Sequence, residues 1–372
     1  MKQAIINGRI FTGENIIDKS VLVVEDGKIV AIQNDIPVNT SVIDLNGKNI
    51  SAGCIDIQIN GGSSYYFTKS PTIDTLNDIC DSSLHFGTTH VLPCLISSSL
   101  KTILSAIEVV KDFMAQYPHK GVIGMHLEGP FLNPLKRGAH PAADVRQPTI
   151  DELKQIVEMG KDVIKVITIA PECFTETQLN ILLQSDFIIS AGHSMMTYQQ
   201  AQYYFSKGIS LVTHLYNAMT QMEHRNPGMV GAIFDNDHVF APIILDGGHC
   251  DYAVARIAYK LKNEKLFLIS DATFLGRSVN EFSWGEFDAQ LVDGYYRNKE
   301  GNLAGAAISM TEAVQNAIQH LKISVEEALK MATVQVAKAI KMEHAIGSIQ
   351  VGCSASFIIF NNDFSQFETM VL

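Results

Sequence analysis

Short apolar runs that end abruptly in polar residues recur along the central part of the chain. Buried strands of a parallel sheet read as near-continuous apolar segments. Eight runs of this kind lie at 54–60, 88–92, 122–128, 164–170, 187–193, 211–214, 242–246 and 266–271. Helix-like segments alternate with them, and capping-box patterns begin at Thr149, Thr175, Thr197 and Ser324. This alternation predicts an α/β fold, a (β/α)8 TIM-like barrel.

A doubly wound parallel sheet is the alternative architecture for such an alternation. That fold commonly carries a Gly-x-Gly-x-x-Gly loop after its first strand. No such loop follows residues 54–60, so the barrel is the favoured prediction.

The two ends of the chain have a different, β-rich pattern. Residues 1–50 contain short β-branched runs, with a hairpin signal at Asp26-Gly27, and the last residues return to this character at 356–360. We expect residues 1–50 and 345–372 to pair in one small β-sandwich domain, and residues 51–344 to form the barrel. Residues 273–304 interrupt the alternation and predict a hairpin insertion that walls the site.

Five ionisable residues stand at predicted strand ends: Glu128, His193, His214, His249 and Asp271. In a barrel, the carboxyl ends of all strands meet at one mouth. Two imidazoles and a carboxylate suit Zn²⁺ or a similar divalent ion with one position open to water. Such an ion lowers the pKa of its bound water to about 7. Taken alone, each histidine is more simply explained as an inert residue at a strand end. Glu128, His193 and His214 together, at the ends of three different strands, favour a metal site.

Each of the other candidate residues has both a functional and a purely structural interpretation. Asp271 is placed for general acid/base chemistry, or it caps the segment that follows. His249 follows two glycines on a loop that we expect to be flexible, where it donates to a substrate oxygen or is an ordinary loop histidine. Arg225 contacts a phosphate, or it is a solvated loop residue.

Composition restricts the partners. The formal net charge of −11 disfavours nucleic acid or an anionic membrane surface. No apolar stretch reaches the roughly 20 residues that span a bilayer. The six cysteines form no Cys-x-x-Cys pair, and residues 1–8 lack a secretory signal pattern. We therefore expect a cytoplasmic protein with reduced thiols.

Five motifs together resemble a known family. They are His126-Leu127-Glu128-Gly129-Pro130, Ala191-Gly192-His193-Ser194, Thr213-His214-Leu215-Tyr216-Asn217-Ala218-Met219, Asp246-Gly247-Gly248-His249 and Ser270-Asp271-Ala272-Thr273. In this order they are similar to the N-acetylglucosamine-6-phosphate deacetylase family of the amidohydrolase superfamily. The resemblance extends from about residue 1 to 360.

The resemblance implies a homodimer that releases acetate from N-acetylglucosamine 6-phosphate to leave glucosamine 6-phosphate. Carried over by motif, Glu128, His193 and His214 resemble the metal ligands, and Asp271 resembles the catalytic acid/base. Arg225 is similar to the arginine that reaches the phosphate in the neighbouring subunit. The remaining substrate contacts implied in this way are Ala139, His140, Asn217, Ala218, His249, Leu303, Ala304 and Gly305.

Two differences from the wider superfamily limit the number of metal ions that we expect in the site. Many amidohydrolases carry His-x-His at the end of strand one, where this chain has Gln58 and Asn60. Since amides are poor ligands, we expect one divalent ion per subunit, Zn²⁺ or else Fe²⁺. Strand four ends at Ala170-Pro171-Glu172 without a lysine, which excludes a carboxylated-lysine bridge. The alternatives are an N-acetylgalactosamine-6-phosphate deacetylase and a non-catalytic scaffold of the same fold.

Overall fold

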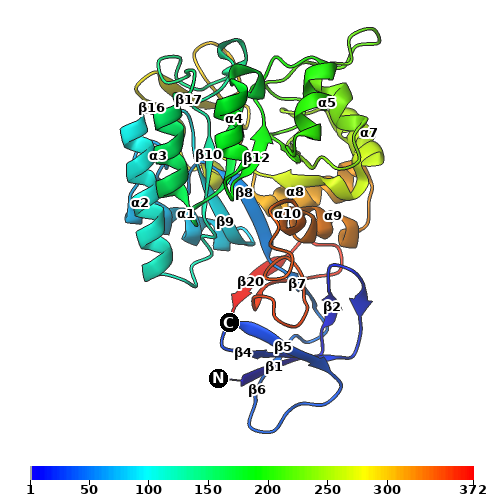
Figure 1. Ribbon diagram of the computed structural model, residues 1–372. Coiled ribbons are helices and arrows are strands. Elements are labelled where there is room, and N and C mark those ends of the chain that lie inside the picture. The colour runs from blue at the N-terminus through cyan, green and yellow to red at the C-terminus, as the bar shows by residue number, and fades with distance from the viewer. Residues whose placement is uncertain (1) are drawn as a thin grey trace.

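The eight predicted barrel strands are all present in the computed structural model, which describes residues 2–372 (Figure 1). Six of them end one or two residues earlier than predicted, β10 ends at Glu128 as predicted, and β9 extends beyond its predicted end to Leu95. Their bounds are β8 (Cys54–Ile59), β9 (Thr88–Leu95), β10 (Met125–Glu128), β11 (Ile164–Ile169), β12 (Ile188–Ala191), β13 (Leu211–Val212), β14 (Ala241–Ile244) and β15 (Leu266–Ile269).

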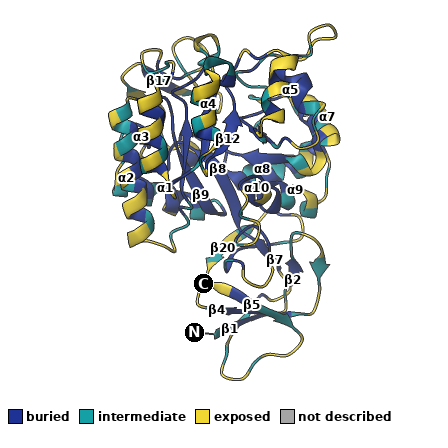
Figure 2. Ribbon diagram, viewed as in Figure 1, coloured by how far each residue is buried: buried dark blue, intermediate teal, exposed yellow. Residues whose placement is uncertain are grey.

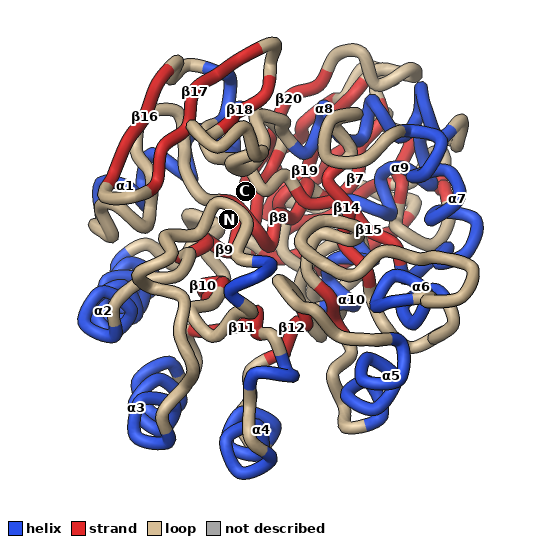
Figure 3. The backbone as a smooth tube through the Cα atoms, turned by 90° about the horizontal axis from the view of Figure 1, so that it is seen from above, coloured by secondary structure: helices blue, strands red, loops and turns tan. Residues whose placement is uncertain are grey.

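These strands close into a barrel. Strands β8 to β13 form one parallel sheet in sequence order, and β14 pairs with β15 in parallel. Single bridges join the two groups, Leu211 to Phe240 and Ile59 to Ala272. Figure 3 looks down on this arrangement, with helices around the strands. The predicted barrel is therefore confirmed, and the doubly wound sheet is not the fold.

The helices cover the outside of the barrel, with their buried faces toward the strands and their exposed faces outward (Figure 2). The side chains of Thr175, Thr197 and Ser324 close complete capping boxes, whereas Thr149 accepts only the backbone N–H of Glu152. The α-helices are α1 (Ile73–His85), α2 (Leu100–Gln116), α3 (Ile150–Gly160), α4 (Glu176–Leu183), α5 (Tyr198–Ser206), α6 (Gly228–Phe234), α7 (Tyr252–Lys262), α8 (Met310–Asn316), α9 (Val325–Ala332) and α10 (Val334–Ala339). Short 3-10 turns lie at Pro134–Lys136, Pro171–Cys173, Asn263–Lys265 and Leu275–Arg277, and a π turn at Ala317–Leu321.

The two ends of the chain share a β unit below the barrel. One sheet has the order β5-β4-β1-β6 and the other β20-β19-β7-β2-β3, so strands from both ends pair in the second sheet. The domain boundaries at residues 50 and 345 stay a prediction. The strands are β1 (Lys2–Ile6), β2 (Arg9–Phe11), β3 (Ile16–Ile17), β4 (Val21–Glu25), β5 (Lys28–Gln33), β6 (Ser41–Asp44), β7 (Asn49–Ala52), β19 (Ser356–Phe360) and β20 (Phe367–Val371).

The β unit has its own apolar core, in which Leu22, Ile50 and Phe357 are fully buried. We expect Leu22→Ala to lower the free energy of unfolding by about 2–5 kcal/mol, because it removes buried methyl groups and leaves a cavity. Urea denaturation of both proteins measures this change. Val42→Ala is the matched control, since Val42 is 49% exposed on β6 of the same unit. Equal losses in the two variants would contradict this assignment of the core.

The insertion over residues 273–304 is larger than the single hairpin that was predicted. It is a three-stranded antiparallel sheet of β16 (Glu281–Trp284), β17 (Phe287–Val292) and β18 (Tyr295–Arg297). Its buried aromatic rings, Phe274, Phe287 and Tyr296, belong to one apolar cluster with Tyr66 from the loop after β8. Within residues 2–372, no helix combines the length and the apolar composition needed to cross a bilayer.

Candidate active site

A cavity of about 520 Å³ opens at the carboxyl-terminal mouth of the barrel. The insertion supplies part of its wall through Phe287, as predicted. Every predicted site residue except Arg225 lines it: Glu128, Ala139, His140, His193, His214, Asn217, Ala218, His249, Asp271, Leu303, Ala304 and Gly305. Arg225 is exposed on the loop before α6. The structure thus brings the candidates together, and their individual roles stay predictions.

Three donor atoms converge at the floor of this cavity. Oε1 of Glu128 lies 3.1 Å from Nε2 of His193 and 3.2 Å from Nε2 of His214, and the two nitrogens are 3.1 Å apart. All three side chains are buried. Ligands about 2.0–2.2 Å from a tetrahedral ion are about 3.3–3.6 Å from one another. The observed separations of 3.1–3.2 Å are slightly shorter than this range. A small divalent cation would need only a small outward movement of the three atoms, and it would separate lone pairs that otherwise face each other.

The second ring nitrogen of His193 supports the same interpretation. Its Nδ1 lies 2.8 Å from the backbone oxygen of Lys136. A carbonyl only accepts, so Nδ1 carries the proton and Nε2 presents its lone pair. A metal-binding histidine is usually fixed in this way by an outer partner. Nδ1 of His214 is buried and has no hydrogen-bond partner among the described residues.

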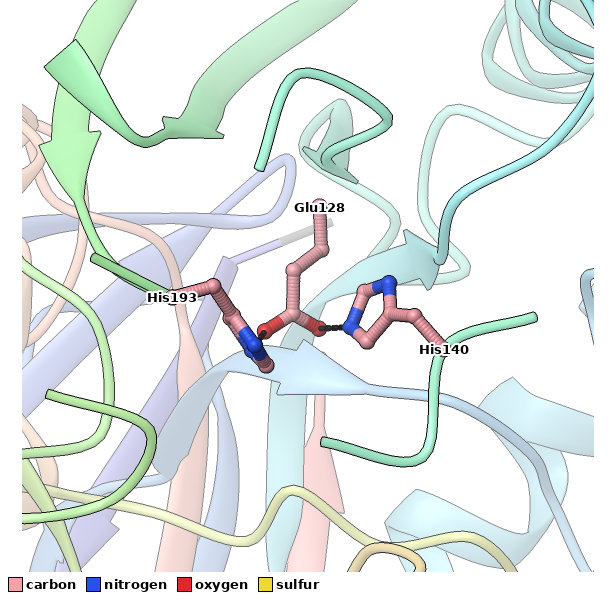
Figure 4. A group of neighbouring side chains, drawn as sticks. All are labelled: Glu128, His140 and His193. Atoms are coloured by element: carbon pink, nitrogen blue, oxygen red, sulfur yellow. Dashed lines mark hydrogen bonds and ion pairs between the residues drawn. The ribbon is translucent and has the colours of Figure 1, made fainter. Parts of the chain in front are cut away.

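His140 also lies beside Glu128 and His193 (Figure 4). The position of its ring proton, however, makes it a hydrogen-bond donor and not a metal ligand. Its Nε2 lies 3.9 Å from Oε2 of Glu128. The backbone N–H of Ser97 donates to Nδ1 of His140 at 3.2 Å. Burial lowers the pKa of His140 to about 3, so the ring is neutral and its one proton is on Nε2. A nitrogen with a proton cannot bind a metal, so His140 fits a hydrogen-bond donor and His214 fits the third ligand.

Asp271 is buried beside the cluster, and two amides hold it. Its Oδ1 accepts from Nδ2 of Asn60 at 2.9 Å and from Nε2 of Gln58 at 3.4 Å. Burial, followed by the negative charge of Glu128, raises the pKa of Asp271 to about 7. A carboxyl group with such a pKa can both accept and release a proton near neutral pH.

Backbone conformation marks the same residues. His193, His214 and Asp271 have φ values of 48°, 27° and 48°. Residues other than glycine rarely adopt the left-handed region, and such conformations cluster at functional sites. Each of these residues lies two positions after the last residue of a strand, and each lines the cavity at the mouth of the barrel.

Sequence reasoning missed the residues that hold the candidate groups in place. Asn60 was noted only as a poor ligand, yet it donates to Asp271. Asp246 was named within a motif but was given no role, yet its carboxylate contacts Nδ1 of His249 at 2.7 Å. The loop before His249 is thus fixed, unlike the flexible loop that was expected. Their place in the sequence could have identified them, because both residues also stand at the end of a predicted strand.

Comparisons with known proteins agree with this geometry. A model of the amidohydrolase family matches residues 49–371, and one of the NagA composite domain matches residues 3–50. The N-acetylglucosamine-6-phosphate deacetylase of Haemophilus influenzae is 31% identical, with 100% of this chain and 98% of that protein covered. The N-acetylgalactosamine-6-phosphate deacetylase of a Shewanella species is 34% identical, with 95% and 91% covered.

A solved structure extends the likeness to three dimensions. The crystal structure of N-acetylglucosamine-6-phosphate deacetylase from Pasteurella multocida superposes with a TM-score of 0.94 at 35% identity, covering 100% of this chain and 98% of that one. The resemblance predicted from the five motifs is confirmed: the chain belongs to the amidohydrolase family.

Proposed function

We propose that the protein hydrolyses the acetamide of N-acetylglucosamine 6-phosphate to glucosamine 6-phosphate and acetate. The observation that carries this proposal is the meeting of three metal-type donors with an adjacent carboxyl group in one cavity. Amide hydrolysis needs an activated water, a polarised carbonyl and a proton for the departing nitrogen. The names of the relatives indicate the sugar.

Glu128, His193 and His214 would hold the divalent ion, Zn²⁺ or else Fe²⁺. The ion would supply Lewis acidity for the carbonyl and lower the pKa of the attacking water. Asp271 takes a proton from that water and passes it to the leaving amine. Asn60 fixes one oxygen of Asp271, which leaves the other oxygen for this transfer.

The remaining lining residues bind the sugar. The neutral His140 offers its Nε2 proton to a substrate oxygen, and the ring is held by Ser97. Asn217, Ala218, Leu303, Ala304 and Gly305 also line the cavity. Arg225 lies outside the cavity of its own chain, so we assign it to the phosphate of a neighbouring subunit in a cytoplasmic homodimer.

Acetate release from the purified protein tests this proposal. N-acetylglucosamine 6-phosphate is supplied with and without a chelator, beside N-acetylgalactosamine 6-phosphate at the same concentrations. We expect release that the chelator abolishes and a higher kcat/KM for the gluco sugar. The galacto epimer is the second candidate substrate, because the Shewanella relative named for it is 34% identical. Release from neither sugar would overturn the function.

The pH profile gives a further prediction. Asp271 must be a carboxylate to accept a proton, so kcat/KM is expected to fall as acidification protonates it. Its pKa is about 7 from burial and the charge of Glu128, and a cation in the site would lower it. The acid limb should therefore lie below pH 7, as measured between pH 5 and 9. A rate that rises from pH 7 to pH 5 would contradict the assigned base.

A further inference from the structure

The loop between β14 and α7 is organised by the carboxylate of Asp246. Its Oδ1 accepts the backbone N–H of Gly248 at 2.9 Å and that of His249 at 2.8 Å. Its Oδ2 lies 2.7 Å from Nδ1 of the His249 ring. One side chain therefore fixes both the backbone and the imidazole of the residue that lines the cavity.

The two glycines of this loop serve its shape. Gly247 has φ of +80°, in the left-handed region that glycine adopts without strain. A Cβ on Gly248 would lie 2.2 Å from the ring of Tyr295, whose hydroxyl donates to the backbone oxygen of Asp246 at 3.1 Å. The glycines thus allow a tight turn and a close contact with β18, which hold the loop in one place.

The partner of His249 also decides where its proton lies. Although burial raises the pKa of Asp246, hydrogen bonds from His249 and Gly248 outweigh this effect and hold the pKa below its usual value. The carboxylate can only accept, so Nδ1 of His249 must donate. Nε2 is then the free atom of the ring, with its lone pair available when the imidazole is neutral.

We infer that Asp246 is a positioning residue for the proposed deacetylation and acts through His249. It keeps the imidazole in the Nδ1–H tautomer and in one orientation, so that Nε2 makes the hydrogen bond to the sugar substrate. This inference rests on the proposed function for its substrate, but the tautomer itself is a property of the chain alone.

Asp246→Asn is the informative substitution. The asparagine oxygen can still accept both backbone N–H groups of the turn, whereas its NH₂ group would face Nδ1 of His249. A donor there forces Nδ1 to accept and moves the ring proton to Nε2. Asp251→Asn is the matched control, because Asp251 is exposed and lies at the end of the same loop. Its carboxylate accepts the backbone N–H of Ala253, and an asparagine oxygen can accept the same bond.

A double-mutant cycle separates positioning from folding. We measure kcat and KM for N-acetylglucosamine 6-phosphate in wild type, Asp246→Asn, His249→Ala and the double variant. We expect Asp246→Asn to lower kcat/KM by about 10-fold or more in wild type and by less than about 3-fold without His249. Equal losses in both backgrounds, or no loss in the first, would overturn the inference. Asp251→Asn should leave both constants unchanged.

A spectroscopic readout needs no turnover. Long-range ¹H–¹⁵N correlation spectra of protein with labelled histidines report which ring nitrogen carries the proton, and His249→Ala assigns the signal among the 12 histidines. The proton should move from Nδ1 to Nε2 in Asp246→Asn and stay in Asp251→Asn. An unchanged tautomer in Asp246→Asn would overturn the inference. If wild type deacetylates neither sugar, the function fails, while this spectrum still decides the role of Asp246.

Discussion

Replacing Asp271 with asparagine is expected to lower kcat by about 10²–10⁴-fold while KM stays near the wild-type value. The asparagine has the same shape and still lines the cavity, so substrate should bind. It cannot accept the proton of the attacking water or return one to the departing amine. Nδ2 of Asn60 also loses its carboxylate partner, but that change alters orientation rather than proton capacity.

The measurement is steady-state kinetics together with metal analysis of the same preparation. Glu128, His193 and His214 remain in place, so the metal content should match that of wild type. Asp293→Asn is the matched control, since Asp293 is exposed at the turn between β17 and β18. Near-normal kcat in Asp271→Asn would remove Asp271 from the reaction.

The second large effect is expected from His214→Ala. Loss of an outer partner of a metal ligand commonly costs 10–100-fold in metal affinity or activity. Loss of a ligand itself should therefore weaken metal binding by more than about 100-fold and reduce turnover in parallel. Oε1 of Glu128 and Nε2 of His193, which are 3.1 Å apart, would be the two ligands that remain. A tetrahedral ion would then have two open positions instead of one.

Metal analysis by mass spectrometry and acetate release measure this effect. His119→Ala is the control, because His119 is exposed and does not line the cavity. Wild type treated with a chelator should resemble His214→Ala and should regain activity when Zn²⁺ or Fe²⁺ is added back. A variant of His214 that keeps about one equivalent of metal would show that His140 is the third ligand instead.

The barrel and the convergence of its candidate metal ligands could be predicted, because both follow from a pattern that is visible in short stretches of sequence. An apolar run that ends in Glu128, His193 or His214 places that residue at the end of a strand. In a closed parallel barrel, all such ends face the same mouth. The order of the strands in the barrel then follows from their order in the sequence.

The groups that orient the candidates could not be predicted in the same way. The bond from Asn60 to Asp271 joins residues 211 positions apart, and no local pattern encodes its distance. The bond from Asp246 to His249 is local, but the two glycines between them indicated mobility rather than a fixed turn. The insertion was predicted as a single hairpin, because the turn at Gly285, which joins β16 to the middle strand β17, was not recognised.

The left-handed backbone at His193, His214 and Asp271 restricts which amino acids these positions can accept, apart from any chemistry. Branching at Cβ is incompatible with such angles, and each unfavourable conformation costs on the order of 1–3 kcal/mol. Asparagine or glycine relieves this cost. Asparagine or glycine at His193 or His214 is therefore expected to raise the melting temperature while it removes a candidate donor atom, so that stability and activity oppose each other at these two positions.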